Sequence, residues 1–188
     1  MIKNPYLYSY LPLITIILFS LTFGLYSVNE AVVLFHKIGV YAGMHEFLSD
    51  VQMRILLLIV FALIYFMIFS ALKLIGETIH DVGMLFFTKD RIDQAMENKA
   101  NAGVVIFFFG ALASVAGLVN VFILVGIFLL SAIFYFIFVT YKLSDYLSFG
   151  SILGIMLFEM TMWILLLTLV VYAIFKLYNG IVSSLPFN

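Results

Sequence analysis

Apolar residues in this chain form long uninterrupted runs instead of alternating with polar positions. A helix that crosses a bilayer needs about 20 such residues, and runs of about this length occur at residues 10–28, 51–75, 102–118, 121–141 and 149–178. The third and fourth runs form one uncharged stretch, residues 102–141, which as a single helix would be about 60 Å long against a hydrocarbon core of about 30 Å. We therefore place a turn at residues 117–120. The pattern predicts an all-α, polytopic transmembrane helix bundle with about five spans, forming one transmembrane domain over residues 1–188.

The connection between the first two spans, residues 29–50, is only partly polar. Read as a helix, it places Val28, Val32 and Phe35 on one face, opposite Glu30. A helix with one apolar and one charged face is typical of the membrane interface. We predict an interfacial or re-entrant helix here, and the pattern does not choose between the two.

The second span has recognisable signals at both ends. Ser49 and Asp50 precede it, and both residue types are preferred as helix N-caps. Beyond the span, apolar positions continue at helical spacing towards Phe86. We expect the helix to continue into this stretch, with Gly76 and Gly83 as the places for a bend.

Positive charge is divided unevenly between the two sides of a five-span arrangement. The side with the N-terminus, which includes the polar loop 88–101, carries Lys3, Lys73, Lys89, Arg91, Lys99 and Lys142. The other side carries Lys37, Arg54 and Lys176. Because cytoplasmic loops are enriched in lysine and arginine, we predict a multi-pass plasma-membrane protein with a cytoplasmic N-terminus and an external C-terminus.

Composition places most of the chain in lipid. Apolar residues make up 65% and charged residues 10%, whereas soluble domains have about 45–50% and about 25%. The net charge of -1 and the lack of a basic cluster give no support for a nucleic-acid partner. The chain has no cysteine, which excludes disulfides and thiolate metal sites. The expected surroundings are the lipid bilayer and a second copy or a partner membrane protein, and we predict no cofactor.

Glu159 is the strongest functional candidate. It is the only charged residue in the run from Leu147 to Phe175, so a centred span would place it deep in the bilayer. An ionisable side chain there is costly and is by default a functional site. Tyr65 and Tyr135 are expected at a similar depth and could donate to it. The carboxyl group could couple proton or substrate movement, or it could be neutral and join helices by a hydrogen bond. The sequence leaves both interpretations open.

Small residues form stripes on two spans. Gly103, Gly110 and Gly117 recur every seven residues, and Gly150 and Gly154 form a G-x-x-x-G pattern. Small residues let helix backbones approach closely in lipid. Packing within one bundle is the preferred interpretation, and dimerisation is the alternative. Glu159 is expected on the face opposite Gly150 and Gly154, so that these two faces of the helix would meet different neighbours.

The histidines do not predict a metal site. His36 and His45 both lie in the connection between the first two spans, but their nine-residue separation puts them on opposite sides of a continuous helix. His45 also does not start an H-E-x-x-H motif, because Ser49 stands at the last position. His80 is followed by Asp81, and we interpret these two as a solvated pair near the inner boundary.

Function is predicted only in outline. The chain has no G-x-S-x-G, Walker or G-x-G-x-x-G motif, which weakens an enzyme hypothesis without removing it, so no catalytic residue is proposed. A non-enzymatic accessory or regulatory membrane subunit is the leading hypothesis. The alternative is a small oligomeric transporter or channel in which Glu159 couples protons or substrate.

Three segments, Met1–Leu21, Ala71–Asp90 and Lys176–Pro186, resemble the YufK-like family of small membrane proteins from Bacillus-type bacteria. The likeness would cover most of the chain. It implies a bacterial plasma-membrane protein with several spans. It implies no activity and supplies no catalytic residue.

Overall fold

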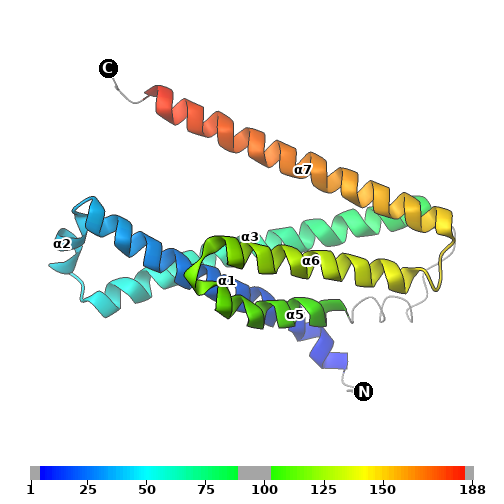
Figure 1. The fold of residues 1–188 in the computed structure, drawn as a ribbon, viewed down its shortest axis with the longest axis horizontal. Helices are drawn as coiled ribbons and strands as arrows, with labels where there is room; N and C mark the ends of the chain where they lie inside the picture. Colours follow the sequence, from blue (N-terminus) through cyan, green and yellow to red (C-terminus); the bar gives the residue numbers. More distant parts are fainter. Residues whose placement is uncertain (1–4, 89–102, 185–188) are drawn as a thin grey trace. The chain divides into compact units, whose positions relative to one another are not determined.

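The computed structural model describes residues 5–88 and 103–184, and every regular element in these ranges is a helix. This confirms the all-α class. In chain order the elements are α1 (Pro5–Lys37), α2 (Val40–His45), α3 (Asp50–Phe87), α5 (Val104–Ala113), the 3-10 helix η2 (Ser114–Val119), α6 (Val121–Leu143) and α7 (Phe149–Ser184) (Figure 1).

Four of these helices, α1, α3, α6 and α7, are long and apolar enough to cross a membrane. They contain four of the five predicted spans. The remaining predicted span, residues 102–118, corresponds to the shorter apolar stretch Val104–Val119, formed by α5 and η2. With 10 α-helical and six 3-10 residues, this stretch is about 27 Å long.

The long helices run well past the predicted spans. α1 has 33 residues and α3 has 38, so they are about 50 Å and about 57 Å long. α1 includes the charged positions up to Lys37, and α3 continues as one helix through Gly76 and Gly83 to Phe87. Positions 89–101 of the predicted polar loop lie outside the residues that the structure describes.

The connection between α1 and α3 is mostly a tight turn followed by the six-residue helix α2. Gly39 turns the chain with a φ of 76°, a conformation that glycine adopts without steric cost. Ser49 then caps α3. Its Oγ accepts from Gln52 N at 3.4 Å, and Gln52 Oε1 accepts from Ser49 N at 3.0 Å. This reciprocal arrangement is a capping box, which confirms the predicted cap at Ser49, while Asp50 is the first residue of the helix.

The described residues cluster into two units. The first contains α1, α2, α3 as far as Ile75, α5, η2 and α6. Its core is built from Phe19, Phe23, Phe69, Ala111 and Leu124. The rings of Phe19 and Phe23 both pack against Phe69, with centroids 5.8 and 5.2 Å away. Aromatic packing therefore joins α1 to α3 in this unit.

α5 and η2 fold back against α6 (Figure 1). The turn is at Asn120, inside the predicted segment, and its side chain caps α6 by accepting from Phe122 N at 2.8 Å. A Cβ added at Gly117 would lie 2.9 Å from the backbone nitrogen of Leu124, and one added at Gly110 would collide with Ser131. The first glycine stripe therefore packs within this unit.

The second unit contains α3 from Gly76 onward and α7. α7 is a single helix of 36 residues (Figure 1). Because α3 is continuous, its first part belongs to one unit and its last part to the other. The contact between the end of α3 and the start of α7 holds the candidate functional site.

Candidate functional site at the α3–α7 contact

The two helices of the second unit meet in antiparallel register. A Cβ at Gly76 would contact the ring of Trp163, one at Gly83 would contact Phe158, and one at Gly154 would collide with the ring of Phe87. Residue numbers thus rise along α3 as they fall along α7. Glycine on either helix gives room for an aromatic ring from the other, so the two helices make ring-to-glycine contacts along about three turns of α3.

His80 and Glu159 lie in the middle of this register. Nδ1 of His80 is 2.6 Å from Oε1 of Glu159. The side chains are 30% and 11% exposed, so the carboxyl is nearly enclosed while the imidazole keeps an open side. With the carboxylate ionised, Nδ1–H donates to it, and a protonated imidazole makes this a charge-assisted hydrogen bond.

Apolar and aromatic groups surround the pair on α7. Ile155, one turn before Glu159, is buried, and Phe158, directly before Glu159, packs at Gly83. One turn after it, Trp163 packs at Gly76, where the ring atom Cζ2 would lie 3.4 Å from an added Cβ. Such surroundings exclude water from the enclosed side of the carboxylate and strengthen its interaction with the imidazole.

The pair can bind and release a proton but lacks the parts of a metal site. No group of three or more His, Cys, Asp or Glu side chains that could hold a metal ion occurs in residues 5–88 and 103–184. On α3, Asp81 adjoins His80 and adds a second negative charge near the imidazole. A histidine and a carboxylate in hydrogen-bond contact are the common elements of proton-linked sites.

The predicted tyrosine partners make other contacts. The hydroxyl of Tyr65 is 2.9 Å from that of Ser27, which joins α3 to α1 in the first unit. The ring of Tyr135 packs on Phe107, with centroids 5.3 Å apart, and beside Gly103. Glu159, which was predicted to meet these tyrosines, contacts His80.

The second glycine pattern also differs from the expected arrangement. Gly154 meets Phe87 and Glu159 meets His80, so both positions contact the same segment of α3 and not two different neighbours. A Cβ added at Gly150 has open space around it. Only one glycine of this pattern therefore makes a close helix contact in the described residues.

His36, in the last turn of α1, and His45, at the end of α2, belong to a separate aromatic cluster. The rings of His36 and Tyr41 are stacked with centroids 3.6 Å apart, and the ring of His45 is 5.8 Å from that of Tyr41. The Tyr41 hydroxyl donates to Asp50, and this hydrogen bond raises the pKa of Tyr41 above its ordinary value. The cluster links the end of α1 and the helix α2 to the first residue of α3.

Sequence reasoning missed the role of His80. Its pairing with Glu159 joins residues 79 positions apart, which local spacing cannot reveal. One signal was available: Gly76, His80 and Gly83 share a helical face. A histidine that lies between two such glycines is expected to face a neighbouring helix and not water.

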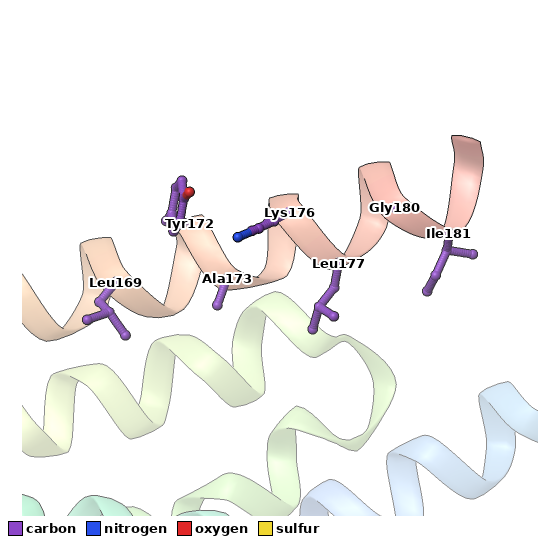
Figure 2. A pocket seen from close by; sticks show the side chains of 7 residues that line it. All are labelled: Leu169, Tyr172, Ala173, Lys176, Leu177, Gly180 and Ile181. Atoms are coloured by element: carbon purple, nitrogen blue, oxygen red, sulfur yellow. The ribbon is translucent and has the colours of Figure 1, made fainter. Parts of the chain in front are cut away.

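The second half of α7 carries an apolar surface. A pocket there is lined by Leu169, Tyr172, Ala173, Lys176, Leu177, Gly180 and Ile181. All of these side chains come from one helix, and Leu169, Leu177 and Ile181 project from the same side of it (Figure 2). A single helix cannot enclose a ligand. The site at His80 and Glu159, by contrast, joins two helices around a charged pair.

Long apolar helices and a carboxylate paired between two of them define a small, multi-pass helical membrane protein. The chain belongs to the family described as "Family of unknown function (DUF5366)", which matches residues 28–186. It is 36% identical over 184 residues to the "Uncharacterized membrane protein YufK" of Bacillus subtilis (strain 168), an alignment that covers 98% of this chain and 99% of that relative. The resemblance seen in the sequence is thereby confirmed. No solved structure matches the chain significantly.

Proposed function

We propose that this protein is a non-enzymatic regulatory membrane subunit whose α3–α7 contact responds to protons. The observation that carries the proposal is the 2.6 Å contact between His80 Nδ1 and Glu159 Oε1. The contact is flanked by close glycine–aromatic packing. A change in its charge therefore acts directly on how tightly two helices associate.

Protonation changes the energy of this contact in a definite direction. The carboxylate of Glu159 accepts a hydrogen bond from Nδ1–H of the imidazole. This hydrogen bond raises the pKa of His80 above its ordinary value, against the lowering effect of burial, so the contact is strongest when the imidazole is protonated. Loss of that proton turns a charge-assisted hydrogen bond into a weaker one. A rise in pH through the pKa of His80 therefore loosens the α3–α7 contact, and a helix pair that opens and closes in this way can signal to a bound partner.

Trp163 provides a direct test, because it is the single tryptophan of the chain and packs at Gly76. We expect a rise in pH through the pKa of His80, which the hydrogen bond to Glu159 raises, to increase quenching of its fluorescence by acrylamide and to shift its emission. In Glu159→Gln, this pH response should be lost. The amide keeps the size of the side chain but cannot ionise.

The matched control is Glu46→Gln, which removes an exposed carboxylate in the connection before α3. It should keep the pH response of the wild type. A wild-type signal that is independent of pH, or a response that survives in Glu159→Gln, would contradict the proposal.

A small proton-coupled transporter is the second candidate, and the partial exposure of His80 favours it. A side chain that is 30% exposed leaves the pair open on one side, as exchange of protons requires. Two measurements separate the candidates. Reconstituted wild type with pH-dependent flux that Glu159→Gln abolishes would support transport. Absence of flux, together with a second membrane protein that co-purifies in mild detergent, would support the regulatory subunit, whereas lipid alone would count against it.

For the topology we propose five spans with a cytoplasmic N-terminus and an external C-terminus. Four helices have spanning length, and α5 with η2 is about 27 Å long, close to the hydrocarbon thickness of about 30 Å. The division of six cations against three supports this orientation. The short helix α2, with its exposed aromatic cluster, would then lie at the external interface.

A further inference from the structure

The antiparallel register of α3 and α7 sets the depth of the candidate site. Along α3, Ile55–Leu72 contains no charged residue and is about 27 Å long. Directly after it come Lys73, Glu77, His80 and Asp81. A charged side chain at the bilayer centre is costly. A bilayer placed over the uncharged stretch avoids this cost, so on α3 the membrane boundary falls close to Gly76.

The same boundary can be transferred to α7 through the contacts. Gly76 packs against Trp163, so these two residues lie at one level. Tryptophan is enriched at membrane–water boundaries, which agrees with this placement. From Ile164 to Ser183, α7 is about 30 Å long, the thickness of the hydrocarbon core.

Exposure along α7 agrees with this boundary. Every residue from 167 to 183 is exposed, and most of them are apolar, as expected for a helix surrounded by lipid. Lys176 is the only charged residue in this stretch. It lies towards the far end, beside Tyr178, where a lysine can extend its amine to the interface.

We propose that the His80–Glu159 site lies outside the hydrocarbon core, at the cytoplasmic boundary of the membrane, and exchanges protons with the cytoplasm alone. The hydrocarbon-spanning part of α7 is then Ile164–Ser183, and Glu159 is not at the bilayer centre. The cytoplasmic side follows from Lys89, Arg91 and Lys99, which come shortly after α3 in the sequence. The source of protons rests on the proposed function, whereas the depth of the site does not.

Cysteine labelling tests the depth directly, because the chain contains no cysteine of its own. Single cysteines are placed at exposed positions on each helix and treated with a membrane-impermeant maleimide in vesicles. Leu85 and Met160, which are 77% and 52% exposed, report on the site level. Ile59 and Leu169, 54% and 62% exposed, report on the lipid level of the same helices.

In inside-out vesicles, Leu85→Cys and Met160→Cys should react at least tenfold faster than Ile59→Cys and Leu169→Cys. In right-side-out vesicles all four should be slow, and all four should react equally in detergent with denaturant. If Met160→Cys is as slow as Leu169→Cys from both sides, the site lies in the hydrocarbon core and the proposed depth is wrong. Fast labelling from the outside only would overturn the cytoplasmic assignment. Neither result depends on whether the contact responds to pH.

Discussion

Replacing His80 with leucine should lower the free energy of unfolding by about 2 kcal/mol at neutral pH. Glu159 is only 11% exposed at its side chain, and the substitution leaves its carboxylate without the imidazole donor. Loss of a hydrogen bond to a charged group costs about 1.5–3 kcal/mol. Breaking a fully buried ion pair costs about 3–5 kcal/mol. We expect a smaller loss here because the side chain of His80 is 30% exposed.

The double variant, His80→Leu with Glu159→Leu, should recover at least half of that loss. Replacing both members of an enclosed pair with apolar residues is often neutral or stabilising. The measurement is reversible unfolding of both single variants and the double variant in the same detergent. The double-variant cycle then gives the coupling energy of the pair.

His45→Leu is the control for this series, because His45 is an exposed histidine in α2. It should change the unfolding free energy by less than about 0.5 kcal/mol. If the losses of the two single variants simply add in the double variant, His80 and Glu159 do not interact energetically. The α3–α7 contact would then depend on its glycine–aromatic packing alone.

Features that depend on adjacent residues could be predicted from the sequence, whereas contacts between residues far apart in the chain could not. The turn at Asn120 and the cap at Ser49 depend on a few adjacent residues, and the sequence predicted both. The continuation of α3 towards Phe86 was also predicted, from apolar positions at helical spacing. The end of α1 was placed too early, because a polar residue such as Lys37 can remain on a helix when one face is accommodated. The hydrophobic run marks where lipid surrounds a helix and does not mark where the helix ends.

Only one of the two residues of the candidate site could be predicted from the sequence. Glu159 stands out because a carboxylate in an apolar run is costly. Its partner could not be found, because the contact depends on the register of two helices far apart in the sequence. The register is fixed by Gly76, Gly83 and Gly154, each opposite an aromatic ring. Local spacing can show that such glycines share a face, but not which rings fill the space beside them.

Replacing Gly117 with alanine should destabilise the protein by about 1–3 kcal/mol, the usual cost of excess volume at a tight contact. An added Cβ would lie 2.9 Å from the backbone nitrogen of Leu124 and 3.1 Å from its Cα. These are backbone atoms, so no side chain can rotate away to make room. The turn between η2 and α6 would have to open, and the loss should appear in reversible unfolding at neutral pH.

Gly126→Ala is the matched control, because it makes the same substitution in α6 where a Cβ meets nothing within 4 Å. Alanine is favoured over glycine within a helix by up to about 1 kcal/mol, so this variant should be as stable as the wild type or more stable. Equal stability of the two variants would contradict the close approach at Gly117.

The oligomeric size of the Gly117→Ala variant separates the two interpretations of the glycine stripe. Packing within one chain predicts a loss of stability at unchanged size, whereas a smaller size at unchanged stability would assign the stripe to a contact between two copies.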